Sequence, residues 1–155
     1  MNGQGPGQLL FEFVRHWARR SSAGGGSLAE QGRLVMVTEA VAALSTRKQT
    51  ATVNAIAEEI GIDQSGASRL VKSAAEAGYL EPRDSPADSR RRQVTLTPRG
   101  HTVLKQAHAW QEHVFMELTP EWSQQRRDDF QTAMADLIAR SQTITSPASS
   151  RQREE

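Results

Sequence analysis

The sequence predicts a mostly α-helical chain with one small β-hairpin, an α+β fold. Apolar residues recur at helical spacing along most of the chain, which indicates amphipathic helices. Between residues 53 and 78, two short helical segments follow one another, and each ends at a glycine. Two strand-like runs, 79–81 and 93–96, then flank a turn that carries three consecutive arginines. The expected order is therefore four helices, two strands and two helices.

The first 46 residues predict two helices. Residues 1–7 are rich in glycine, and we expect them to be flexible. Residues 8–21 and 28–46 both carry apolar side chains at helical spacing. The glycine-rich stretch 21–27 separates them as a flexible break. We expect the two helices to serve as scaffold and in dimerisation.

Residues 53–78 predict two short helices joined by a tight turn. Thr52 is placed to cap the start of the first, because a hydroxyl can accept a bond from a free amide of the first turn. Gly61 ends that helix, since glycine tolerates the left-handed conformation found after helix ends. Asp63 is expected to cap the second helix and Gly78 to close it. The apolar positions expected to be buried are Val53, Ile56, Ala57, Ile60, Ala67, Leu70, Val71 and Ala74.

The hairpin and the C-terminal helices complete the chain. Residues 79–81 and 93–96 read as paired strands, with Val94 and Leu96 facing inward. Thr97 caps a long helix, 98–118, whose first residue is a proline, a residue well tolerated there. A last helix is expected at 120–142. Residues 143–155 are polar and are expected to be disordered.

A helix pair followed by a basic hairpin suits a DNA duplex. The second helix fits the major groove, and the hairpin tip reaches the neighbouring minor groove. We expect Lys72 to contact a phosphate, whereas Arg69 can reach either a guanine edge or a phosphate. The expected contacts from the exposed face of the second helix are Gln64, Ser65, Ser68, Arg69 and Lys72.

Three consecutive arginines, Arg90, Arg91 and Arg92, are the expected contacts from the hairpin. Arg90 is expected at the tip, where it would enter the minor groove, whose narrow A·T tracts enhance negative potential. Asp88 precedes it by two residues and has two open roles. It can orient Arg90 through a charge-assisted hydrogen bond, or it can simply form the turn together with Pro86.

The distribution of charge supports a polyanionic partner for the middle of the chain. The whole chain carries a formal charge of only +1. Residues 61–105 carry +3, residues 106–155 carry −3 and residues 1–60 carry +1. Local asymmetry of this kind matters more to a polyanion than the total charge does.

The segment SGASRLVKSAAEAGYLEPR, followed by SPADSRRRQVTLTPRG, resembles the MarR family of bacterial winged helix-turn-helix regulators. The resemblance extends in organisation over about residues 30–140. Ser85 replaces the aspartate that usually opens the family's wing motif, and Gly66 stands where the family often has serine or threonine. The wing positions that match are Pro86, Asp88, Arg90, Leu96, Thr97 and Gly100.

The resemblance implies a domain organisation and a mode of action. It implies a winged helix-turn-helix DNA-binding lobe at 47–97, flanked by dimerisation helices at 8–46 and 98–142. A homodimer would bind a pseudo-palindromic operator in double-stranded DNA. The family also implies an effector pocket where the dimerisation helices meet the lobe, frequently for aromatic or phenolic acids.

Three residues are candidates for such an effector pocket: His16, Trp17 and Trp110. Two interpretations stand open for them. They can line a ligand site, or the tryptophans, which fall at helical spacing, can be ordinary packing residues.

Several classes of site and activity are not expected. There is no cysteine, which excludes disulfides and thiolate metal sites. His101 and His108 share a helix face but lie about 10 Å apart, so we expect no metal site, although His108 and Glu112 have a spacing that could share an ion. No motif for a nucleophile or a phosphate loop is present, and we expect no catalysis and no cofactor. Without an apolar span or a signal-like start, the expected location is the cytoplasm.

The predicted function is that of a sequence-specific, double-stranded DNA-binding transcriptional regulator. It is expected to act as a dimeric repressor that a small aromatic or phenolic effector releases. Two alternatives remain. One is a winged-helix adaptor that binds a protein, and the other is a DNA-binding regulator without a small-molecule effector.

Overall fold

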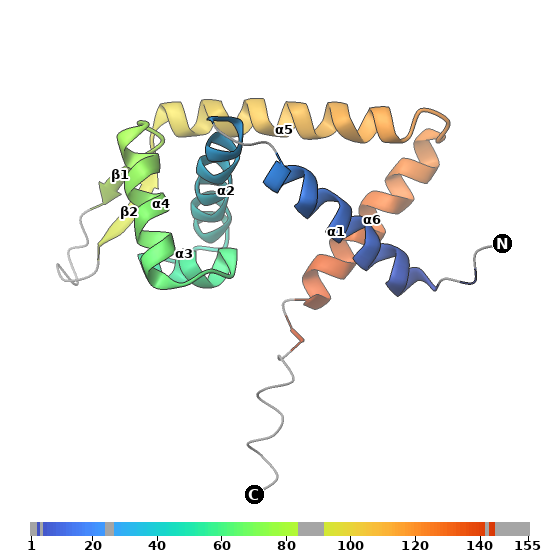
Figure 1. The fold of residues 1–155 in the computed structure, drawn as a ribbon, viewed down its shortest axis with the longest axis horizontal. Coiled ribbons are helices and arrows are strands. Elements are labelled where there is room, and N and C mark those ends of the chain that lie inside the picture. The colour runs from blue at the N-terminus through green and yellow to red at the C-terminus, as the bar shows by residue number, and fades with distance from the viewer. Residues whose placement is uncertain (1–2, 4, 24–26, 84–91, 142, 145–155) are drawn as a thin grey trace, which may run out of the picture. The chain divides into compact units, whose positions relative to one another are not determined.

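The computed structural model describes residues 3, 5–23, 27–83, 92–141 and 143–144, and the side chains of 20–28 are not among them. Over these residues the elements follow the order that the sequence predicts, with four helices, two antiparallel strands and two helices. Figure 1 traces these elements along the chain. The α+β fold class is therefore confirmed. The elements are α1 (Pro6–Ala23), α2 (Ser27–Thr46), α3 (Val53–Ile60), α4 (Gln64–Glu76), β1 (Leu80–Arg83), β2 (Gln93–Leu96), α5 (Pro98–Leu118) and α6 (Gln124–Ser141).

Four predicted boundaries are wrong. Residues 21–23 belong to α1 and Ser27 begins α2, so the break predicted at 21–27 does not extend over them. Helix α1 begins at Pro6, so residues 6 and 7 are helical and do not belong to a flexible N-terminus. Strand β1 runs over Leu80–Arg83 and not over 79–81. Helix α6 begins at Gln124 and not at residue 120. The amide of Trp122 donates to the carbonyl of Thr119 at 3.2 Å, which closes a turn before α6 can start.

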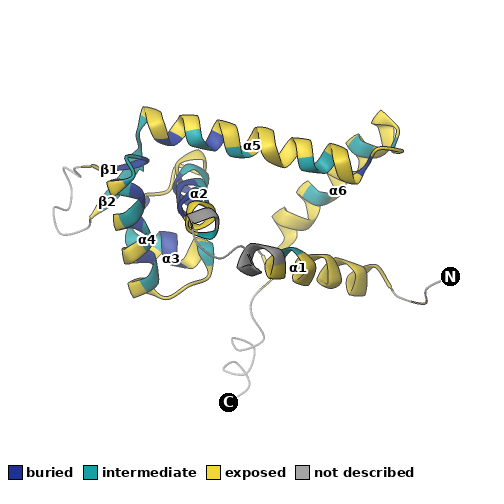
Figure 2. Cartoon of the chain, turned by 45° about the horizontal axis from the view of Figure 1, so that its top comes forward, coloured by how far each residue is buried: buried dark blue, intermediate teal, exposed yellow. Residues whose placement is uncertain are grey.

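Most of the apolar core lies within a unit formed by α2, α3, α4, β1 and β2. This unit is called the lobe from here on, and it includes α2 in addition to the predicted lobe at 47–97. Figure 2 shows the buried residues concentrated on these elements and on the first turns of α5. Val37 and Thr38 of α2, Ile56 of α3 and Ala67 of α4 are all 0 % exposed. The hydroxyl of Thr38 is satisfied because it donates to the carbonyl of Leu34 at 2.7 Å. Most of the core therefore belongs to the lobe, and Val103 at the start of α5 packs against it.

Local hydrogen bonds fix the ends of α3 and α4 as the sequence predicts. The hydroxyl of Thr52 accepts a bond from the amide of Ala55 at 3.1 Å, and the carboxylate of Asp63 accepts one from Gly66 at 2.5 Å. Gly61 has φ 77° and Gly78 has φ 80°. Both values lie in the left-handed region, which favours glycine. These residues set the turn that holds the two helices together.

The end of α4 and the start of α5 are joined by a tight backbone contact. The hydroxyl of Thr97 donates to the carbonyl of Gly78 at 2.5 Å and accepts from the amide of Gly100 at 2.9 Å. A Cβ atom placed on Gly100 would lie 2.2 Å from the carbonyl oxygen of Tyr79. Only glycine fits at this position, because that oxygen belongs to the backbone and cannot move aside.

The chain divides into two compact units, Met1–Gln111 and Glu112–Glu155. The second unit holds an aromatic cluster of Phe115, Trp122 and Phe130, with ring centroids 5.5 to 6.3 Å apart. The guanidinium of Arg126 lies 4.3 Å from the centre of the Trp122 ring. Arg127 donates to the carbonyl of Thr119 at 2.7 Å. These contacts order the corner between α5 and α6.

Helix α6 has no buried residue, and none of the described residues of α1 is buried. Both helices nevertheless carry large apolar side chains. Among the residues that the structure describes, no helix combines the length and the apolar character needed to span a bilayer.

Candidate nucleic-acid interface

Helix α4 presents one polar face away from the core. Its apolar residues Ala67, Val71 and Ala74 are buried against the rest of the lobe. The alternation of apolar and polar positions at helical spacing therefore gives α4 a solvent face. The predicted contact residues on that face are all exposed: Gln64, Ser65, Ser68, Arg69 and Lys72.

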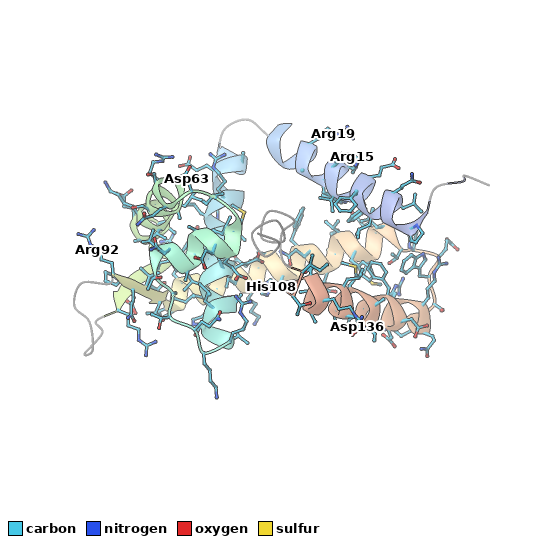
Figure 3. All side chains as sticks on the ribbon, turned by 90° about the horizontal axis from the view of Figure 1, so that it is seen from below. Arg15, Arg19, Asp63, Arg92, His108 and Asp136 are labelled. Atoms are coloured by element: carbon cyan, nitrogen blue, oxygen red, sulfur yellow. The ribbon has the colours of Figure 1, made fainter. Side chains whose placement is uncertain are left out.

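A groove of about 790 Å³ runs along this face of the lobe. It brings together the start of α3, the first half of α4 and the base of the hairpin. Figure 3 shows Arg92 projecting from the start of β2. The lining residues are Thr52, Val53, Asn54, Gln64, Ser65, Ser68, Arg69 and Arg92. Five of them belong to the predicted DNA-contact set.

Strand β2 places Arg92 in the groove. The amide of Val94 donates to the carbonyl of Ala51 at 3.1 Å, and Thr52 forms an isolated antiparallel bridge with Gln93. The residues just before α3 therefore run alongside β2 as a short extra strand. This pairing brings the base of the hairpin against the start of α3.

The groove lining is basic. Among the described lining residues, it contains the guanidinium groups of Arg69 and Arg92 and no carboxylate. Within the described part of the chain, neither guanidinium forms a hydrogen bond or an ion pair. Lys72 lies outside the groove and stands 4.0 Å from Glu76, in an exposed pair of the kind that contributes little to stability. The groove can therefore accept a negatively charged group without first breaking an ion pair of either arginine.

Sequence reasoning missed part of this site. Thr52 was expected chiefly as a helix cap, at a helix N-terminus that can also receive a phosphate, and Val53 only as an apolar position. Asn54 was not considered. It is a polar, exposed residue at the second position of α3, and that exposure is the signal that could have pointed to it. Its proximity to α4 and Arg92 depends on long-range pairing, which local pattern does not reveal.

The tip of the predicted hairpin lies outside the described residues. Asp88, Arg90 and Arg91 fall in the stretch 84–91, so their roles stay predictions. Arg92 is the one member of the arginine run among the described residues.

The candidate effector residues lie on two helices. His16 and Trp17 are neighbours on α1, with ring centroids 6.1 Å apart. Trp110 lies on α5 and is 59 % exposed. Their role as an effector site stays a prediction.

His108 takes part in a contact that sequence spacing did not reveal. Its Nε2 lies 3.2 Å from Oε1 of Glu39 on α2, and the side chain of Gln111 donates to the same oxygen at 3.1 Å. His108 therefore contacts α2, whereas the spacing had suggested Glu112 as a partner. Over the described ranges, no three histidine, aspartate or glutamate side chains gather as metal ligands would.

Comparisons with known proteins agree with the fold. Residues 31–91 match the model of the MarR family. No curated protein sequence matches the chain. A MarR family transcriptional regulator from Silicibacter pomeroyi has a similar structure, with a TM-score of 0.64 and 20 % identity over 92 % of this chain and 97 % of that one.

Two further solved structures are similar. Wild-type MarR from E. coli in its apo form gives a TM-score of 0.61 at 18 % identity, over 88 % of this chain and 99 % of that one. BpsR from Bordetella bronchiseptica gives a TM-score of 0.54 at 17 % identity, over 84 % of this chain and 98 % of that one. The description of the BpsR structure concerns the regulation of its DNA binding by 6-hydroxynicotinic acid.

At these identities, structural similarity establishes the fold, and the family match rests on the central segment that holds most of the lobe. The predicted resemblance is confirmed: the chain has the winged-helix fold of the MarR family of transcriptional regulators, and its residues 31–91 match that family's model.

Proposed function

We propose that this protein is a dimeric regulator of transcription that binds double-stranded DNA in a sequence-specific manner and represses the genes it controls. The observation that carries the proposal is the groove at the polar face of α4. Exposed polar residues of α4 line this groove together with two arginines, Arg69 and Arg92. Among the described residues, neither arginine has an acidic partner. Helix α4 follows α3 as a recognition helix follows the first helix of a helix-turn-helix. Such a surface suits phosphates and base edges together.

The distribution of exposed apolar side chains supports a homodimer. Most of the large apolar residues that are exposed within the described ranges lie on α1, α5 and α6. Exposed apolar side chains in such number are typical of an interface in a protein that is stable in water. A symmetric dimer buries such surface on both copies at once. The residues are Leu9, Leu10, Phe11, Phe13, Val14, Trp110, Met116, Leu118, Phe130, Leu137 and Ile138.

A small aromatic or phenolic acid is the proposed effector, with His16, Trp17 and Trp110 as the residues that would contact it. The support is indirect, from the BpsR structure, whose description names an aromatic acid as the regulator of DNA binding. An effector would act by binding one spacing of the two lobes better than another. A thermal-shift series with hydroxylated aromatic acids tests this, because a ligand at 100 times its Kd stabilises by about 2.7 kcal/mol. No shift in the series would favour a regulator without a small-molecule effector.

Selection of bound duplexes from random sequence, with the purified protein at moderate salt, is the decisive experiment. We expect an enriched inverted repeat with half-sites about ten base pairs apart, since a two-fold dimer presents its recognition helices one turn of DNA apart. Weak, salt-sensitive binding without enrichment would contradict the proposal. It would favour the second candidate, a winged-helix adaptor that binds an acidic protein.

Substitution of the predicted wing-tip arginine tests the mode of binding. We expect Arg90→Ala to lower operator affinity about tenfold or more, since the loss of one specific arginine contact costs roughly 1–3 kcal/mol. The dimer should remain folded, as measured by circular dichroism and sedimentation. Unchanged affinity in a gel-shift titration would show that Arg90 does not contact DNA.

A further inference from the structure

We infer that the groove between α3 and α4 holds a backbone phosphate of the bound duplex, that Asn54 contacts this phosphate, and that Arg69 binds the backbone and not a base edge. The inference rests on the proposed function. It adds Asn54 to the predicted contacts, and it decides between the two roles that the sequence left open for Arg69.

The position of Arg69 favours the backbone. In helix-turn-helix proteins the N-terminal residues of the second helix reach base edges, and the first helix crosses the sugar-phosphate backbone. Arg69 is the sixth residue of α4, and it shares the groove with residues of α3, namely Val53 and Asn54. Gln64 and Ser65 line the same groove, but Arg69 lies more than one helical turn beyond them along α4. Gln64 and Ser65, at the start of α4, are left as the residues nearest to base edges.

The hydrogen-bonding groups on this side of the groove are mostly donors. Arg69 and Arg92 offer guanidinium N–H groups, which match the geometry of phosphate oxygens. The side-chain amide of Asn54 offers an NH₂ group, and it makes no hydrogen bond within the described part of the chain. The hydroxyl of Thr52 accepts from the amide of Ala55, so its own hydrogen is free to donate outward. Donors from α3, α4 and β2 therefore converge on one space.

A phosphate fits this arrangement better than a base pair does. A phosphate accepts several hydrogen bonds from different directions and carries a negative charge, whereas a base edge offers a planar pattern to one side chain. The volume of about 790 Å³ leaves room for the adjoining sugars as well. The described lining residues carry two positive charges, from Arg69 and Arg92, which attract a phosphate.

The test compares three variants on the duplex selected by the wild-type protein and on duplexes with single base-pair changes. In Asn54→Asp, a negative charge enters the groove while helix α3 is retained, because acidic residues are favoured in a first turn. Arg69→Ala removes one guanidinium. Arg33→Ala is the control for loss of charge, since Arg33 is exposed on α2 and does not line the groove.

We expect Asn54→Asp and Arg69→Ala each to lower affinity about tenfold or more on every duplex alike. The salt dependence should weaken as well, because each phosphate contact contributes about one unit to the slope of log K against log salt. For Arg33→Ala we expect less than a twofold change in DNA affinity and an unchanged slope of log K against log salt. Circular dichroism of each free variant establishes that the fold is intact.

Two results would overturn the inference. If Arg69→Ala relaxed the preference at one base pair of each half-site and left the salt slope unchanged, Arg69 would be a base-reading residue. If Asn54→Asp bound every duplex as the wild type does, no phosphate would lie in the groove. A wild-type protein that bound no duplex at all would instead overturn the proposed function.

Discussion

The lobe and the terminal helices α1 and α6 differ in where their apolar side chains lie. In the lobe, residues such as Val37, Ile56 and Ala67 are completely buried. In α6 no residue is buried, and side chains such as Ile138 are more than half exposed. The apolar spacing in the sequence looks alike in both regions. It reveals that a helix has an apolar face, but not whether the same chain or another copy covers it.

A truncation in the lobe should have the largest effect. We expect Ile56→Ala to lower the free energy of unfolding by about 2–5 kcal/mol, because it removes a fully buried side chain and leaves a cavity. Each kcal/mol corresponds to roughly 2–4 °C in Tm for a chain of this size. Thermal unfolding followed by circular dichroism measures it. Ile144→Ala is the matched control, since Ile144 is 74 % exposed. An equal loss of unfolding free energy in this variant would contradict the difference between buried and exposed apolar residues.

A charge on α6 should affect assembly and not the lobe. We expect Ile138→Asp to raise the dimer Kd about 100-fold, which corresponds to about 2.7 kcal/mol, because a charged group would be buried without a partner. Sedimentation at several protein concentrations measures the dissociation. Ile62→Asp serves as the control, since Ile62 is an exposed apolar residue of the lobe. If both variants dimerised like the wild type, the terminal helices would not form the interface.

Helix caps allow the finest comparison of the two regions. We expect Thr52→Ala to lower the free energy of unfolding by about 1 kcal/mol, because the amide of Ala55 loses its partner. Ser123→Ala removes the corresponding contact at α6, where the bond from Arg126 is longer, at 3.3 Å. Its effect should therefore be smaller. Urea unfolding measures both, and a larger loss for Ser123→Ala would show that α6 contributes more to stability than its burial indicates.

The elements that were predicted correctly depend on local chemistry. Thr52, Gly61, Asp63 and Gly78 act through neighbours in the sequence, and their positions fixed the ends of α3 and α4. Helix α5 has the predicted bounds for the same reason. The predicted start of α6 is wrong because proline favours the first position of a helix, whereas Pro120 lies before this helix begins. The structure instead places Pro120 within a turn and Ser123 before the first helical residue.

The parts of the candidate site that were missed depend on contacts between distant residues. Asn54 comes close to Arg92 only because β2 pairs with the residues before α3. His108 likewise contacts Glu39, which precedes it by 69 positions in the chain. No helical or strand periodicity contains such information. The exposed face of α4, by contrast, followed directly from the apolar spacing of its opposite face.

The contact between Gly100 and Tyr79 has a mechanical consequence. The oxygen of Tyr79 lies where a side chain at residue 100 would be, and Thr97 is hydrogen-bonded to both Gly78 and Gly100. We therefore expect the first turns of α5 and the last turn of α4 to move together. A tilt of the first turns of α5 would therefore change the orientation of α4, the proposed recognition helix. The absence of a side chain at Gly100 is what allows the two helices to be joined so closely.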